Sequence, residues 1–213
     1  MFGLLFLSCL ACGHTVSGGP VSTEGPSNRD VEVALTQLAM KHTPPSAICE
    51  LDASPEADRR TARPRDGGGL TIQLPRLDGW SERGGQRESA TTVLENSNIR
   101  TSTYVPEMRI RSAIQSPNVS VEDYLDATEG GRKTDATWRR IHTSPRFACG
   151  LEGRFMVGVR SDRAPVYEVV LLLARDVGTD VQSAEFVSST TDPSNEKFRD
   201  GLVRAFEGLR VST

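Results

Sequence analysis

The stretch VYEVVLLLAR, residues 166–175, constrains the fold more than any other part of this sequence. Within it, VVLLLA is apolar at every position instead of at alternate ones. Successive side chains of a strand point to opposite faces of its sheet, so an unbroken apolar run indicates a strand that is covered on both faces. We therefore expect a buried central strand here.

Several other stretches show the alternation that is typical of half-buried strands. In MRIRSAIQ, Met108, Ile110 and Ser112 share one face, and the arginines between them share the other. In RFACGLEGRFMVGVR we expect a hairpin with its turn near Leu151 to Gly153. The remaining expected strands are LTIQLP, ATTVLEN and DVQSAEFVSST.

Three segments have the apolar spacing of amphipathic helices. The first is DVEVALTQLAMKH, capped by Asn28 or Asp30. The second is SVEDYLDAT, for which Ser120 is the expected N-cap. The third is close to the C-terminal end, with Asp192 as its cap and Pro193 at its first helical position.

Together these elements predict an α+β domain spanning residues 30–213. We expect an antiparallel β-sheet meander with flanking helices and one helix inserted in the middle. The length of 213 residues leaves room for one core of ordinary size.

The last helix carries the most apolar face of the sequence, which we expect to lie over the VVLLLA strand. Two interpretations of this face compete: it is packed in the core, or it faces a hydrophobic ligand held between helix and sheet. We name these residues as the possible ligand-facing set. They are Phe198, Leu202, Phe206 and Leu209.

The N-terminal sequence MFGLLFLSCLACGHT is an uncharged apolar run that leads into Cys12. The run has the length of a signal peptide and is too short to span a bilayer as a helix of about 20 residues. Ala11 and Leu10 before Cys12 resemble a bacterial lipobox. We predict a lipoprotein signal peptide and lipidation cysteine in residues 1–12, with lipid on Cys12, and a flexible tether in residues 13–29. Cys9 as the lipidated residue and an ordinary secretory signal stay open as alternatives.

The two other cysteines are Cys49 and Cys149. In an exported protein they can oxidise, and a disulfide closing a loop of about 100 residues stabilises by up to roughly 5 kcal/mol in the chain-entropy model. We predict this disulfide, with two unpaired thiols as the alternative.

The charge pattern and the histidines exclude several functions. The formal net charge is −3, with both signs spread along the chain, so no nucleic acid partner is expected. The histidines are His14, His42 and His142, and we expect the imidazole of His142 to face solvent. We also expect the arginines of the strands to face solvent. Contact of those arginines with anionic lipid headgroups is the alternative. We predict no catalytic residue, no cofactor and no metal site.

The order of these elements resembles the actinobacterial LpqN/LpqT lipoprotein family, whose domain is PsbP-like. The resemblance covers about residues 30 to 211 and is carried by TIQLPRLDGW and by TTDPSNEKFRDGLVRAFEGLRV. It implies an envelope protein on the outer face of the cytoplasmic membrane, with no catalytic residues to transfer.

These observations favour a lipid-anchored, non-enzymatic cell-envelope protein. Its expected partners are the membrane, through the anchor, and an envelope lipid or a membrane protein. Two alternatives remain: an envelope hydrolase whose site has no visible motif, and a structural surface lipoprotein without a ligand.

Overall fold

The computed structural model describes residues 27–42, 59–63, 69–83, 90–115, 118–148, 151–161 and 164–212. Within these residues the chain forms helices and two antiparallel sheets, so the expected α+β class is confirmed. The larger sheet has seven strands in the order β3-β4-β5-β9-β8-β7-β6, and the smaller has three in the order β1-β2-β10.

The seven-stranded sheet consists of two meanders that meet where β5 pairs with β9. The strand that contains VVLLLA is β8, which pairs with β7 and β9. It is buried on both faces from Val166 to Ala174, as expected, although β9 and not β8 is the middle strand. The strands of this sheet are β3 (Ser81–Glu82), β4 (Thr91–Glu95), β5 (Glu107–Gln115), β6 (Trp138–Ala148), β7 (Leu151–Ser161), β8 (Pro165–Val177) and β9 (Asp180–Thr190).

The smaller sheet brings the two ends of the domain together. Its centre is β2, which pairs with β10 in the register Val211 to Ile72. TIQL therefore lies outside the main sheet and pairs with a strand that follows the last helix. The strands are β1 (Arg60–Ala62), β2 (Thr71–Leu74) and β10 (Arg210–Ser212).

The hairpin of β6 and β7 also differs from expectation. β7 begins at Leu151, so the connection lies between Ala148 and Leu151 and Gly153 is inside the strand. A Cβ on Gly153 would lie 2.3 Å from the carbonyl oxygen of Leu172. The glycine is therefore required by a close approach between strands and not by a turn.

All three predicted helices are present, but two begin differently. Helix α1 (Asn28–His42) is preceded by Ser27, whose hydroxyl accepts from the Asp30 amide at 3.3 Å while Asp30 accepts from the Ser27 amide. Ser27 is thus the cap, in place of Asn28 or Asp30. Helix α3 (Glu196–Gly208) is capped by Asn195, which accepts from the Phe198 amide.

Asp192 and Pro193 precede α3 and do not start it. The Asp192 carboxylate accepts from the amide and hydroxyl of Ser194, which forms a turn before the helix. Helix α2 (Val121–Thr134) begins as expected, with Ser120 accepting from the Asp123 amide at 3.1 Å. A short 3-10 helix, η2 (Ser97–Ile99), follows β4.

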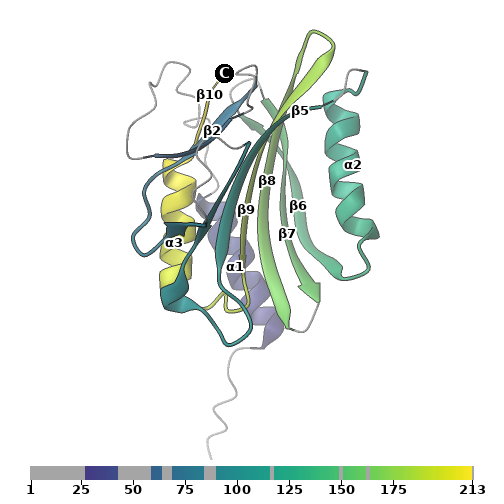
Figure 1. Ribbon diagram of the computed structural model, residues 1–213. Helices are drawn as coiled ribbons and strands as arrows, with labels where there is room; N and C mark the ends of the chain where they lie inside the picture. The colour runs from purple at the N-terminus through teal and green to yellow at the C-terminus, as the bar shows by residue number, and fades with distance from the viewer. Residues whose placement is uncertain are drawn as a thin grey trace, which may run out of the picture.

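The two faces of the sheet are covered differently (Figure 1). Helices α1 and α3 lie on one side, where they share the main hydrophobic core with alternate residues of β5, β7, β8 and β9. Helix α2 lies on the other side, where Val121 and Leu125 pack against Val170 and Leu172 in a smaller cluster. Each face of β8 is thus apolar because each meets a helix.

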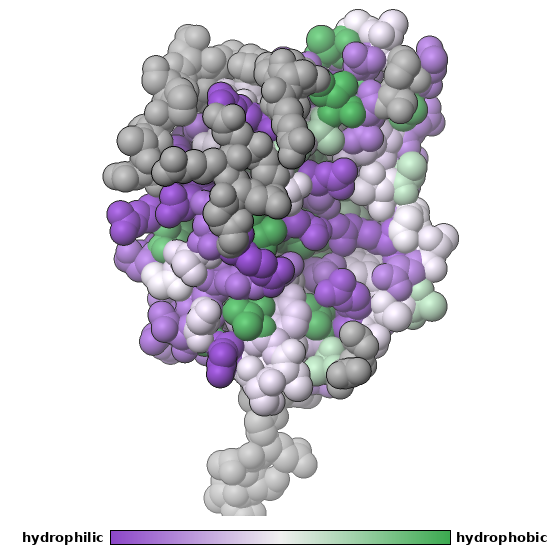
Figure 2. All heavy atoms as spheres, in the orientation of Figure 1, coloured by the Kyte–Doolittle hydropathy of each residue, from purple (hydrophilic) through white to green (hydrophobic). Residues whose placement is uncertain are grey.

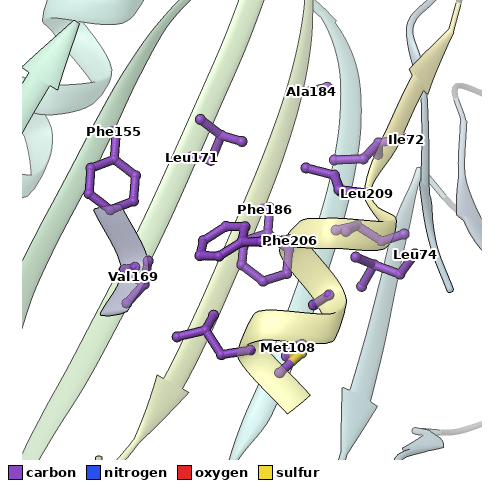
Figure 3. Close-up of a cluster of buried hydrophobic side chains, with 14 of the residues drawn as sticks. Ile72, Leu74, Met108, Phe155, Val169, Leu171, Ala184, Phe186, Phe206 and Leu209 are labelled. Atoms are coloured by element: carbon purple, nitrogen blue, oxygen red, sulfur yellow. The ribbon is translucent and has the colours of Figure 1, made fainter. Parts of the chain in front are cut away.

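The core under α3 is closed by aromatic contact (Figure 3). Phe206 of α3 packs on Phe186 of β9 with ring centroids 5.1 Å apart, and both side chains are fully buried. Trp80 also belongs to this core, with 9 % of its surface exposed.

Candidate functional site

A cavity beside α3 has a volume of about 320 Å³. We call it the α3 pocket. Three segments form it: the turn between β2 and β3, the loop after β4, and the outer side of α3. Its lining residues are Leu77, Asp78, Gly79, Asn96, Asn98, Lys197, Asp200, Gly201 and Arg204.

Local backbone chemistry fixes the floor of the α3 pocket. Gly79 has a φ of 78°, in the left-handed region that glycine adopts most easily. Asn96 is 3 % exposed. Its backbone N–H donates to the Pro106 carbonyl, and its side-chain oxygen caps η2 by accepting from the backbone N–H of Asn98 at 3.1 Å. A Cβ on Gly79 would lie 3.3 Å from Asn96 Nδ2, so the glycine also lets the two segments approach.

The rim of the α3 pocket carries charges of both signs. Arg204 Nη1 lies 3.0 Å from Asp78 Oδ2 and joins the helix to the turn. Asp200 and Lys197, one turn and two turns earlier on α3, are exposed and have no ion-pair partner among the described residues. The pocket therefore offers the unpaired charged groups of α3 and the exposed Asn98 side chain to the polar part of a ligand.

The second cavity, which we call the charged cavity, has a volume of about 100 Å³ and lies between the end of α2 and the sheet face that α2 leaves uncovered. Its floor comes from β5 and β9, where Glu107 is paired with Ser189 and Arg109 with Val187. Its lining residues are Glu107, Arg109, Arg132, Asp135, Trp138, Arg160, Glu168, Val187 and Ser189.

Glu168 is the most connected charge in the charged cavity, and it is only 5 % exposed. Its Oε2 accepts from Arg132 Nη1 at 3.1 Å and from the Trp138 indole at 3.2 Å. Arg160 lies 3.6 Å from its other oxygen. Arg132 also donates to Glu185 at 2.9 Å, so one guanidinium joins α2 to two strands. Burying a carboxylate is costly unless it is paired in this way.

Trp138 reaches Glu168 because its indole crosses a glycine of the adjacent strand. The indole lies over Gly158 of β7, and a Cβ there would come within 2.2 Å of the ring. Gly158 is paired with Glu168 of β8, so the open glycine surface directs the indole N–H toward the carboxylate.

The residues proposed as ligand-facing are all in the main core. Phe198, Leu202, Phe206 and Leu209 are 0–1 % exposed, and none of them lines the two cavities. All four belong to the main core cluster, in which Phe206 packs on Phe186 of β9 and Leu209 lies near Ile72 of β2 (Figure 3). Their role toward a ligand stays a prediction. Cys9, Cys12, the tether residues before Ser27, Cys49 and Cys149 lie outside the described residues, so lipidation and the disulfide also stay predictions.

The expectation that the His142 imidazole faces solvent is wrong. Its Nε2 is buried, and the ring lies beside Phe155, with centroids 6.1 Å apart. A shift of register between Arg140 and His142 turns this part of β6 toward the core side. No residue that the structure describes donates to or accepts from this imidazole.

The arginines of the strands are also more engaged than expected. Arg139 donates to Glu32 of α1 at 2.5 Å, and this bond raises the pKa of the guanidinium. Arg140 lies 3.1 Å from Glu129 of α2. These pairs fasten helices to the sheet edge.

Neither a metal site nor a membrane-spanning helix is found in the described ranges. No three His, Cys, Asp or Glu side chains gather there in a way that could hold a metal ion. None of the helices there has both the length and the apolar character needed to cross a bilayer. On the face shown in Figure 2, hydrophobic residues form small separate groups among hydrophilic ones.

The fold is similar to that of solved proteins. LpqN of Mycobacterium tuberculosis, described as involved in cell envelope biogenesis, matches with a TM-score of 0.58 at 12 % identity, over 73 % of this chain and 91 % of LpqN. Cyanobacterial PsbP from Synechocystis matches with a TM-score of 0.42 at 11 % identity, over 78 % of this chain and 99 % of that one. No protein-family model matches the sequence, and no curated protein does. The likeness to LpqN confirms the expected PsbP-like fold.

Both cavities were missed at the level of sequence. Glu168 is the one charge in the buried part of β8, from Val166 to Ala174. That exception was the available signal, because a charge buried there needs a partner. Its partners Arg132 and Trp138 are 36 and 30 residues away, so spacing did not connect them. The α3 pocket had no signal of its own beyond the Asp78-Gly79 turn.

We predict that Glu168→Gln lowers the free energy of unfolding by about 1–3 kcal/mol, because Arg132 and the Trp138 indole lose their charged acceptor. Urea denaturation measures this change. The matched control is Glu152→Gln on β7, which is exposed and should change stability by less than about 0.5 kcal/mol. Equal effects of the two substitutions would contradict the importance of the Glu168 contacts.

Proposed function

We propose that this chain is a lipid-anchored, non-enzymatic cell-envelope protein that holds an envelope lipid, by its polar headgroup, next to the membrane. Two observations support the envelope location. The N-terminal sequence ending in Leu10, Ala11 and Cys12 has the pattern of a lipidation signal. The domain also has the fold of LpqN, a protein described as involved in cell envelope biogenesis.

The α3 pocket is the observation that carries the binding role. It is large enough for a headgroup, at about 320 Å³, and its exposed Lys197, Asp200 and Asn98 are available to a ligand. A purely apolar ligand in the α3 stripe would instead have to separate Phe206 from Phe186. Because that contact is buried, the polar pocket is the easier place to bind without unfolding.

The same pocket also suits a polar segment of a membrane protein, which is the second candidate. Its rim charges and amides can pair with a protein partner as readily as with a headgroup. A non-enzymatic role agrees with the position of His142, whose buried Nε2 has no nucleophile within hydrogen-bond distance among the described residues.

The anchor gives the first prediction of this proposal. Cys12→Ser should move the protein from the membrane fraction to the soluble fraction, because stable anchoring requires acyl chains on that residue. Fractionation of cells followed by immunoblotting measures the shift, with Cys9→Ser as the control. Release by Cys9→Ser and retention of Cys12→Ser would assign the lipid to the other cysteine.

The pocket gives the second prediction. Asp200→Trp should fill the α3 pocket and reduce the lipid that copurifies with the protein from its own host, measured by native mass spectrometry. Arg199→Trp is the matched control, since Arg199 is exposed on the same helix and does not line the pocket.

Leu202→Trp separates the pocket from the core stripe. Leu202 is fully buried, so a larger side chain should lower stability by about 1–3 kcal/mol through overpacking. If Leu202→Trp removes the lipid and leaves the melting temperature unchanged, the ligand lies between α3 and the sheet. Absence of any copurified lipid would contradict lipid binding and favour the protein partner.

A further inference from the structure

The charged cavity has more hydrogen-bond donors than its own acceptors use. Its three acids already have donors: Glu168 accepts from Arg132 and Trp138, Glu107 lies 3.4 Å from Arg83, and Asp135 accepts from Thr137. The bonds from the Thr137 hydroxyl and amide lower the pKa of Asp135 and keep it ionised. Each acid of the cavity therefore already has a donor.

Arg109 is the main unused donor. It lies on β5 at the cavity floor, and its Nε is buried with no hydrogen-bond acceptor. None of the ion pairs among the described residues includes it. A buried guanidinium N–H without a partner is costly, so such a group is common where a ligand or an ordered water completes the bonding.

Two further donors lie at the same cavity. Ser189 is 2 % exposed, and its oxygen accepts from the Tyr104 hydroxyl at 2.8 Å. Burial raises the pKa of Tyr104, so this phenol keeps its proton as a donor and the Ser189 proton is left to donate elsewhere. Arg160 lies 3.6 Å from Glu168, longer than a hydrogen bond, and its side chain is 42 % exposed at the cavity mouth.

We propose that the charged cavity binds one phosphate or carboxylate group, held by Arg109, Arg160 and the Ser189 hydroxyl. The volume of about 100 Å³ accommodates a single oxyanion and not an acyl chain. Because three arginines and three acids line the cavity, recognition depends on directed hydrogen bonds and not on a broad positive field. This site is separate from the α3 pocket and does not rest on the function proposed for it.

The experiment titrates the full-length protein with inorganic phosphate and with acetate, followed by NMR of backbone amides and arginine Nε–H groups. We expect saturable shifts at Arg109 and Ser189 and a higher melting temperature in phosphate. Arg109→Gln should weaken binding about tenfold or more, since it removes a charge-assisted donor pair. Arg109→Lys, which keeps the charge but not the fork of donors, should weaken it less.

The matched control is Arg111→Gln, because Arg111 is exposed on the same strand and face but does not line the cavity. It should bind phosphate as the unsubstituted protein does. Flotation with phosphatidylglycerol vesicles distinguishes a lipid headgroup from a free anion. Vesicle binding that Arg109→Gln abolishes assigns the site to a lipid headgroup. Phosphate binding without vesicle binding assigns it to a free anion. Absence of saturable shifts with both anions, or equal affinity of Arg109→Gln and Arg111→Gln, would overturn the proposal and leave the cavity to solvent.

Discussion

The pairing of β5 with β9 is the contact on which the rest of this structure depends. Nine residue pairs, from Glu107 with Ser189 to Gln115 with Val181, join the β3–β5 meander to the β6–β9 meander. Without this seam neither meander has a complete apolar face, because Met108 and Ile110 share the core with Phe186. The helices cover a face that exists only when the two meanders are paired.

The same seam positions both cavities. On the side away from α1 and α3, β5 and β9 place Arg109 and Ser189 at the floor of the charged cavity. At the start of β5, the Pro106 carbonyl accepts from Asn96, which holds one wall of the α3 pocket. The larger apolar core therefore lies on the α1 and α3 side of the sheet, and the polar residues of the charged cavity lie on the opposite face of β5 and β9.

Alternation and apolar runs were sufficient to predict most strands and all three helices. They worked for β5 and β8 because burial on one face or on both faces leaves a direct pattern in the residues. The helix caps were harder to predict, because Asp and Asn residues close to Ser27 and Asn195 are also favourable capping residues. Gly153 was placed in a turn from sequence. The glycine is instead required by its close approach to Leu172, and the sequence does not show that these two residues are neighbours.

The candidate sites could not be predicted because their residues come from separate segments. The apolar α3 face, the one candidate that sequence did locate, is packed into the core, as amphipathic faces usually are. Polar pockets have no periodicity, so their residues become recognisable only when topology places them together. The exposed charges of α3 are one such case, since they differ from ordinary surface charges only by their neighbours on the Asp78 turn.

Hydrogen exchange of backbone amides, measured by NMR, tests most directly the claim that the β5–β9 seam makes one cooperative sheet. The account predicts that the amides around Ile110 and Phe186, which face each other in the seam, exchange at the same slow rate and only through global unfolding. A β3–β5 meander that exchanges faster as a unit, while β7 and β8 stay protected, would contradict it.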